Sequence, residues 1–532
     1  MENNYMKKII FALVLLCALD NSLEGLLVNI CQPATERKEY DAVLLVLNDK
    51  QYDDTQKTWL KEFCGDDGVL AFEQMIEARA KPVGNFWVPQ KGGKLITWAS
   101  LLLLQKKASQ DEILEELRCC LGKALTALEE EKIKSVAIIL PDALGVLVGG
   151  WDVALREITI VAHLATYLFS YATTKPQNST LQCIDLVRSE GTINEPAVNI
   201  GNIIGRYTNL ARQWGDEAPG RLLPQKWAQL VKHEAKLAGC SYKALDIKKI
   251  RSLGMGGVLG VHAGASKAGP VVMVLEYAPK NPAGTVALVG KGVIFDSGGL
   301  HMKSRENIHH MKFDKCGGAA ALAACLAAAS LKLPMRVIAI VPAVLNKTGS
   351  NAQHPRDIVR MMNGKTVEIN NTDAEGRLIL ADGLHYAEKF YKPDVLIDIA
   401  TLTGSCRQAL GFGYSGLMSR HDRLKGKLIM AGKRSGDYLW ELPLTKMYQT
   451  GNDSDVADIS NSAEKSYGAG AIMAGLFLES FVQSSCWAHL DIAGPSAQVP
   501  YSWFGSKGAT GFGVRLLVDF ITNYEVDNNG VA

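Results

Sequence analysis

The sequence predicts an α/β fold in two parts: a smaller N-terminal α/β domain over residues 26–185, and a larger C-terminal domain over residues 190–532 with a mixed sheet flanked by helices. Three observations support this prediction. The length of 532 residues suits two or more domains. Apolar, β-prone runs alternate with helix-like segments through the second part, which is typical of a mixed or mostly parallel sheet covered on both faces. A polar, proline-containing stretch at residues 173–179 is the best candidate for a linker.

The first 25 residues form an N-terminal extension whose pattern bears on location. Lys7 and Lys8 precede an apolar run that ends at Leu19, an arrangement similar to the n- and h-regions of a secretory signal peptide. That run is too short to cross a membrane as a helix, and Asp20 and Asn21 stand where a small-x-small cleavage site is wanted. The 11 cysteines have no regular spacing, which suits reduced thiols. We therefore expect a cytoplasmic protein, with secretion as the alternative.

Strands and helices are predicted from apolar runs and their spacing. In the N-terminal domain we expect strands near Leu26 and at residues 41–47 and 135–140, and a helix at residues 110–131. In the C-terminal domain we expect strands at residues 271–275, 286–289, 336–341, 366–369 and 395–399, and helices at residues 319–331 and 378–391. The N-terminal domain contains no group of residues that suggests a chemistry.

Charge and motif spacing exclude several classes of protein. Lys plus Arg number 57 and Asp plus Glu number 55, so no bulk charge favours nucleic acid or an anionic membrane. A Walker loop is excluded around Lys291, because position 285 is Thr and Gly292 follows the lysine. His233-Glu234 lacks the second histidine of a helical zinc-protease motif.

The octapeptide at residues 371–378 is the most informative stretch of the chain. Asp373, Glu375 and Arg377 stand two residues apart, so in an extended segment their side chains would point to one face. Two neighbouring acids repel each other unless a cation lies between them, and a divalent metal meets that need. Taken alone, the same pattern also fits a solvated, charged loop.

A second group of charged residues lies upstream and favours the metal interpretation. Lys291, Asp296, Lys303 and Asp314 follow a short apolar run at residues 285–288 that is predicted to be a buried strand. Lys291 and Asp296 would then lie at the end of a strand and in the loop beyond it. Open α/β sheets bind their ligands at that end.

Together these two groups resemble the leucine aminopeptidase (cytosol aminopeptidase) family of two-metal exopeptidases, whose signature is the octapeptide. The resemblance covers roughly the last two-thirds of the chain. It implies a homohexamer and a metal-dependent aminopeptidase that acts on peptides with a free N-terminus. The implied metal ligands are Lys291, Asp296, Asp314, Asp373 and Glu375, of which Asp296 and Glu375 would contact both ions. Lys303 and Arg377 would be catalytic, with bicarbonate at Arg377 as proton shuttle, and Met311, Thr401 and Gly404 would form the substrate pocket.

The resemblance also implies a chemistry. The four carboxylates balance two divalent ions in charge, and the donor set suits Zn or Mn first, with Mg or Co as alternatives. Lys291 can ligate only as a neutral amine, so metal affinity should fall in acid. A hydroxide that bridges the ions would attack the scissile carbonyl. Coordination of the substrate's α-amine would limit cleavage to one N-terminal residue, and the adaptable side chain of Met311 favours Leu and other apolar residues there.

Some positions depart from the family pattern or carry plainer interpretations. Leu345-Asn346 and Pro355-Arg356-Asp357 stand where the family often has Glu-Asn and Pro-Gly-Asp, and we expect neither departure to touch a ligand. We interpret His301 as a loop residue and Cys316 as a buried thiol. We interpret His489 and Asp491 as structural residues of the core. The alternatives for function are a non-enzymatic family member in a structural or nucleic-acid-binding assembly, and a nucleotide-dependent enzyme.

Overall fold

A computed structural model describes residues 26–31, 41–48, 61, 83–89, 95–103, 109–140, 144–169, 179–188, 194–265, 268–463, 467–483, 485–500, 502–504 and 508–525. The chain forms two compact units. The first comprises residues 1–209 with 501–506, and the second comprises residues 210–500 with 507–532. The signal-like segment and most of the candidate linker lie outside the described residues.

The first unit contains a six-stranded sheet in the order β1-β6-β5-β2-β4-β3, parallel except at β3–β4. Its strands are β1 Leu27–Cys31, β2 Ala42–Asn48, β3 Val83–Pro89, β4 Leu95–Leu103, β5 Ser135–Leu140 and β6 Cys183–Arg188. Its helices are α3 Gln110–Glu130, α4 Leu144–Leu147, α5 Trp151–Ala165 and the first part of α6 Glu195–Asp216. The predicted strands and helix of this part are confirmed. Helix α3 begins where Ser109 and Glu112 form a capping box.

The second unit contains a nine-stranded mixed sheet in the order β16-β15-β18-β14-β9-β11-β8-β7, with β10 paired to β11. The strands are β7 Ser241–Leu245, β8 Val271–Tyr277, β9 Thr285–Gly290, β10 Gly292–Asp296, β11 Arg336–Asn346, β14 Val395–Ala400, β15 Ser415–Met418, β16 Leu439–Glu441 and β18 Cys486–Asp491. Strands β9, β10, β11, β14 and β18 run parallel, whereas β8 is antiparallel to β11 and β15 to β18. The predicted mixed sheet is confirmed. Its central strands are buried along their length, as their continuous apolar runs require.

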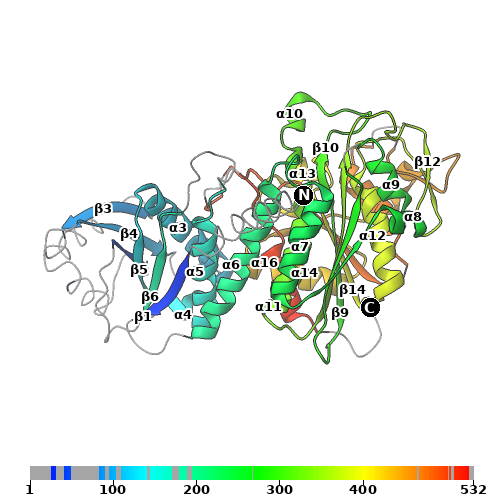
Figure 1. Cartoon of the computed structure of the whole chain (residues 1–532). Helices are drawn as coiled ribbons and strands as arrows, with labels where there is room; N and C mark the ends of the chain where they lie inside the picture. The colour runs from blue at the N-terminus through cyan, green and yellow to red at the C-terminus, as the bar shows by residue number, and fades with distance from the viewer. Residues whose placement is uncertain are drawn as a thin grey trace, which may run out of the picture. The chain divides into compact units, whose positions relative to one another are not determined.

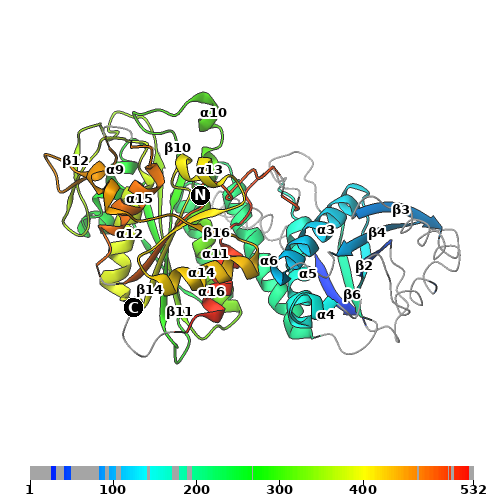
Figure 2. The same cartoon turned by 180° about the vertical axis from the view of Figure 1, so that it is seen from behind.

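Helices cover both faces of this sheet (Figures 1 and 2). One layer contains α7 Pro224–Ala238, α11 Cys316–Ser330, α14 Asp422–Ser435 and α16 Val514–Asn523. The other contains α8 Ile247–Ser252, α9 Gly256–His262, α12 Gly376–Tyr391 and α15 Gly470–Glu479. Almost all of α11 is buried, and its small alanine side chains let it pack closely on β9, β11 and β14.

The remaining elements surround the carboxyl ends of the central strands. A three-stranded sheet consists of β12 Ile358–Arg360, β13 Thr366–Glu368 and β17 Ile459–Ser460. The short helices are α10 Arg305–Ile308, η1 Met311–Phe313, α13 Gly404–Leu410 and η2 Lys446–Asn452. Within the described ranges, no helix has the length and apolar character that crossing a membrane requires.

Candidate metal centre

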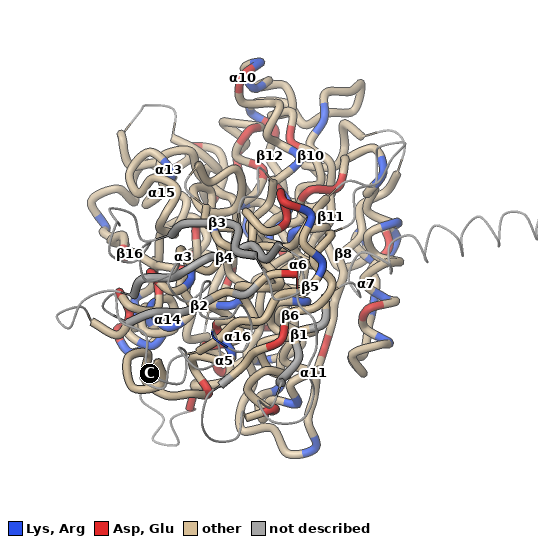
Figure 3. The backbone as a smooth tube through the Cα atoms, turned by 90° about the vertical axis from the view of Figure 1, so that its left-hand side faces the viewer, with Lys and Arg blue, Asp and Glu red and all other residues tan. Residues whose placement is uncertain are grey.

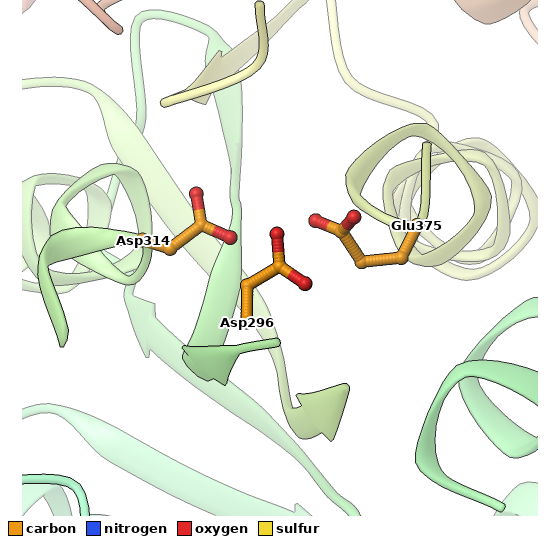
Figure 4. Close-up of side chains that lie close together, drawn as sticks. All are labelled: Asp296, Asp314 and Glu375. Atoms are coloured by element: carbon orange, nitrogen blue, oxygen red, sulfur yellow. The ribbon is translucent and has the colours of Figure 1, made fainter. Parts of the chain in front are cut away.

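Three buried carboxylates converge beyond the carboxyl ends of β9 and β10. Asp296 is the last residue of β10, Asp314 follows η1, and Glu375 stands at the N-cap of α12. Figure 4 shows the three carboxylates pointing toward one another, and one oxygen from each lies within 4.8 Å of the others. All three are less than 7% exposed. Carboxylate oxygens gathered in this way form a site that a hard or borderline divalent cation can occupy.

The local backbone differs from the sequence prediction in two respects. Asp296 ends a strand and does not lie in the loop beyond it. The octapeptide is not extended: Asp373 lies in a turn, Glu375 has helical backbone angles (φ −77°, ψ −35°), and Arg377 is inside α12. The predicted alternation therefore does not bring these side chains to one face. The turn before α12 brings Asp373 to the cluster, and the start of α12 brings Glu375 there. Arg377 lies behind them in the buried first turn of the helix.

Lys291 lies at the centre of the cluster. Its Nζ is 2.8 Å from Asp314 Oδ1 and 2.9 Å from Glu375 Oε1, and it donates to the carbonyl oxygen of Thr401 at 2.9 Å. Burial acts to lower the pKa of Lys291, but the carboxylates of Asp314, Glu375 and Asp296 outweigh it and raise this pKa above its ordinary value. In this arrangement the ammonium supplies part of the positive charge that the carboxylates need.

A glycine makes room for that lysine. A Cβ at Gly376 would lie 2.5 Å from Lys291 Cε and 2.8 Å from its Nζ. Non-bonded carbons prefer about 3.5–4.0 Å, so no other residue fits beside the lysine as it stands. The requirement for glycine in the octapeptide is therefore steric.

Lys303 bridges the two remaining carboxylates. Its Nζ lies 2.9 Å from Asp296 Oδ2 and 2.6 Å from Asp373 Oδ1. Burial would lower the pKa of Lys303, but Asp296, Glu375 and Asp373 raise it. Burial, with Glu375 and Asp296 close by, raises the pKa of Asp373 to about 7. The lysine is partly exposed toward the cavity, so it can also reach a bound ligand.

The lysines do not satisfy the cluster. Asp314 Oδ2 and Glu375 Oε2 are buried and accept no hydrogen bond from any described residue. Buried carboxylate oxygens are almost always paired, and two ammonium charges face four carboxylates. Burial raises the pKa of Asp314 well above its ordinary value, with Glu375 and Asp296 adding to that effect against Lys291. Unpaired acceptors with excess negative charge fit bound divalent cations.

Asn346 positions Asp296 and was missed by the sequence prediction. Its Nδ2 donates to Asp296 Oδ1 at 2.7 Å and to the carbonyl oxygen of Thr372 at 3.0 Å, and the N–H of Gly298 donates to the same Asp296 oxygen at 2.9 Å. The expectation that Leu345-Asn346 stays clear of the ligands is therefore wrong for Asn346. Asn346 ends β11 beside β10, which the strand predicted at residues 336–341 does not reach.

Two further residues hold the octapeptide in place. Thr372 Oγ1 donates to the carbonyl oxygen of Gly298 at 2.7 Å. Asn461 Oδ1 accepts from the N–H groups of Asn370 and Asn371, and its own carbonyl oxygen accepts from Arg377 Nη1 at 2.7 Å. Asn461 is fully buried and 90 residues from Asn371, so no local pattern could have identified it.

Arg377 is the one predicted site residue that does not line the cavity described below. It is 8% exposed, and its Nε finds no hydrogen-bond partner in the described part of the chain. Burial lowers the pKa of Arg377 to about 10, while Glu375 and Asp491 act to raise it. The guanidinium therefore lies as a buried cation behind Glu375.

The cluster opens into a cavity of about 900 Å³. The five predicted ligands and Lys303 line it, and so do Met311, Thr401 and Gly404. Thr401 Oγ1 donates to Asp314 Oδ1 at 2.7 Å, which joins the pocket wall to the cluster. The rest of the wall is partly apolar, through Met302, Phe313, Leu402 and Phe412.

The residues with plainer interpretations lie as expected. His301 bonds to Thr372 in its loop, and it lines a separate polar cavity of about 460 Å³. Cys316 is buried at the start of α11. His489 is buried with its Nδ1 2.5 Å from Asp398 Oδ1, and Asp491 accepts a 2.6 Å bond from Thr403 Oγ1.

Arg356 occupies a strained position. It stands with φ +74°, a left-handed conformation that favours glycine, at a cost of about 1 kcal/mol. Its Nη1 is 2.7 Å from Glu368 Oε1, so an ion pair accompanies the strained backbone. Arg356 thus adopts a backbone conformation that the glycine of Pro-Gly-Asp would adopt without strain.

Comparison with known proteins gives a consistent result. Residues 209–518 match the model described as "Cytosol aminopeptidase family, catalytic domain". A "Probable cytosol aminopeptidase" of Chlorobaculum tepidum is 47% identical over 334 residues, which cover 62% of this chain and 65% of the relative. One of Rickettsia canadensis is 38% identical over 367 residues, which cover 68% and 73%. The chain thus spans 65% of the length of the first of these relatives.

Most of the chain also matches a solved structure. The solved structure "Bottromycin maturation enzyme BotP in complex with Mn" superimposes with a TM-score of 0.76 at 28% sequence identity. The match covers 91% of this chain and 99% of that one.

Proposed function

The chain belongs to the cytosol aminopeptidase family, and we propose that it is a metal-dependent aminopeptidase that removes Leu and other apolar residues from the N-terminus of peptides. The observation that carries this proposal is the buried group of carboxylates with unpaired oxygens, next to two lysines in one cavity. Such a group is costly to bury and needs cations to compensate it.

Lys291, Asp296, Asp314, Asp373 and Glu375 would hold two divalent ions. When bound, those ions would polarise the scissile carbonyl and make a nucleophile available from water at neutral pH. Zn and Mn suit this set of donors, and the Mn complex of the structural neighbour favours Mn.

The cationic side chains of the site have distinct proposed roles. Lys303 reaches the cavity and would donate a hydrogen bond to the oxygen that becomes negative as the carbonyl is attacked. Arg377 is buried behind Glu375, where it would stabilise that carboxylate and could hold bicarbonate as proton shuttle through its unpaired Nε. The unpaired Nε of Arg377 supports this role.

The pocket for the N-terminal side chain would be formed by Met311, Thr401 and Gly404. Apart from its chain neighbours and its own helix backbone, no described residue has an atom within 4 Å of a Cβ built on Gly404, so this residue leaves open space in the cavity. Met311 supplies an adaptable, apolar surface. Both features favour Leu, Met and similar residues over charged ones.

We further propose a cytoplasmic homohexamer that binds no nucleic acid. The formal net charge is +2, and Figure 3 shows Lys and Arg interspersed with Asp and Glu along the described backbone. A nucleic-acid-binding member of the family would need its basic residues gathered on one surface. The unpaired ligand oxygens also have no role in a purely structural protein.

The test is hydrolysis of a leucyl amide reporter by the purified protein, after chelation and after restoring Mn or Zn. We expect activity that chelation abolishes and metal restores, and no activity on the same reporter with an acetylated amine. A correctly folded protein that cleaves neither reporter with any metal would refute the proposal.

A further inference from the structure

The mouth of the cavity contains an arginine that the aminopeptidase chemistry does not use. Arg407 lies on α13 and lines the same cavity as the carboxylate cluster. Its side chain is exposed, and its guanidinium carbon lies 4.5 Å from the ring centroid of Phe412, another wall residue. Stacking on an aromatic face orients a guanidinium and leaves its N–H donors available to a ligand.

No acid of the wall balances Arg407. The acidic side chains that line the cavity are those of the predicted ligands, which form ion pairs with Lys291 and Lys303 and whose remaining charge the proposed cations would balance. The polar residues of the outer wall are all neutral or cationic: Ser304, Asn307, His310, Gln408, Ser496 and Gln498. Among the ion pairs that the described residues form, none includes Arg407. Within the described part of the chain, the cavity thus offers a fixed positive charge that no carboxylate of the protein pairs with.

The position of Arg407 fits the departing part of a peptide. Thr401 contacts the cluster through Asp314 and Lys291, and Thr403 caps α13. Arg407 is four residues beyond Thr403, about 6 Å along the helix axis. An extended peptide advances about 3.3–3.6 Å per residue. Groups on the second or third residue of a substrate would therefore come within reach of the guanidinium once the N-terminal residue occupies the cluster.

We propose that Arg407 recognises a carboxylate on the part of the substrate that follows the scissile bond. This inference rests on the proposed function. The carboxylate has two possible sources, the C-terminal α-carboxylate of a di- or tripeptide and the side chain of Asp or Glu at the second or third position. Both offer the planar pair of oxygens that a guanidinium binds through two parallel hydrogen bonds.

The experiment compares matched acid and amide substrates on the wild-type, metal-loaded enzyme and on R407Q. Leu-Gly against Leu-Gly-amide tests the α-carboxylate, and Leu-Glu-amide against Leu-Gln-amide tests the side chain. We expect wild type to prefer at least one acid about threefold to tenfold in kcat/KM, mainly through KM, because the ion pair is partly exposed. In R407Q that ratio should fall to about one, while turnover of a leucyl amide reporter stays within about twofold.

K389Q is the matched control. Lys389 is an exposed cation beside an aromatic ring, with its Nζ 5.9 Å from the centroid of Phe390, and it does not line the cavity. It should keep the wild-type preference. The substrate pair whose acid preference is lost in R407Q identifies the source of the carboxylate.

Two results would overturn the inference: no preference for either acid in an active wild type, or a preference that R407Q retains. An enzyme that cleaves no leucyl substrate would instead overturn the proposed function, and this inference with it.

Discussion

Replacing Gly376 by Ala should disable the metal centre without unfolding the protein. The new Cβ would lie 2.5 Å from Lys291 Cε. To restore an ordinary contact of about 3.5–4.0 Å, the end of the lysine must move by about 1–1.5 Å. Metal ligands tolerate displacements of about 0.2 Å, and a misplacement of about 1 Å in an active site costs on the order of 100-fold in rate.

The free energy of unfolding should not fall in G376A, in contrast to its activity. The atoms in the way are at the far end of a flexible side chain, so the backbone is not forced apart. Gly376 is the first residue of α12 and its φ is not positive, so Ala fits its backbone. An Ala in place of a helical Gly stabilises by up to about 1 kcal/mol. We therefore expect G376A to melt at or above the wild-type temperature while kcat/KM falls about 100-fold.

The assay measures bound metal by mass spectrometry after dialysis, thermal unfolding, and hydrolysis of a leucyl amide. G426A is the matched control, because Gly426 lies exposed inside α14 with no atom within 4 Å of a built Cβ. It should gain similar stability and keep full activity. Wild-type metal content and activity in G376A would refute the steric reasoning.

Three further predictions follow from single contacts or groups of contacts. N346A removes a 2.7 Å hydrogen bond to Asp296, so its metal affinity, measured by competition with a chelator, should fall about 10- to 100-fold, and an unchanged affinity would contradict the role given to Asn346. Burial raises the pKa of Asp382 to about 7, although the N–H groups of Met362, Val258 and Gly257 oppose this. Between pH 4 and 7 the native protein therefore holds a proton that the unfolded chain has already released, because the pKa of an unfolded Asp is about 3.9. The stability that this bound proton contributes is complete below that pKa and is lost as pH rises to 7. The stability advantage of wild type over D382N in urea unfolding should therefore grow as pH falls from 7 to 4, and a constant difference would contradict this. Adding Mn or Zn at 100 to 1,000 times its dissociation constant should stabilise the fold by about 3–4 kcal/mol, seen as a rise in melting temperature that D314N lacks; equal melting with and without metal would contradict a cation site.

The strands could be predicted where apolar runs are unbroken, as at residues 135–140, which match β5. The strand predicted at residues 336–341 is too short; the next residue is Pro342, of a type that is rare inside strands. Strand β11 nevertheless continues through Pro342 to Asn346, where it pairs with β10. That unpredicted extension delivers Asn346 to Asp296, and Asn346 was not among the predicted site residues.

The residues that line the cavity could be named from the sequence, but the way they come together could not. Alternation along an extended octapeptide would place Asp373, Glu375 and Arg377 on one face. Helix α12 instead begins at Gly376, two residues before the predicted start, and turns Arg377 away from the cavity. Asn461, a fully buried residue about 90 residues further along the chain, accepts hydrogen bonds from the backbone at the start of this segment. Local patterns contain no such information.

The arrangement of the centre explains why its residues are so far apart in sequence. The three buried carboxylates are attached to different elements: Asp296 to the end of β10, Asp314 to the turn before α11, and Glu375 to the start of α12. Four like charges gathered on one flexible loop would separate to lower their repulsion. Here the packed sheet and helices prevent that, and the two lysines offset only half of the negative charge. The fold thus holds its carboxylates closer together than their own charges favour, and divalent cations are the partners that this enforced proximity suits.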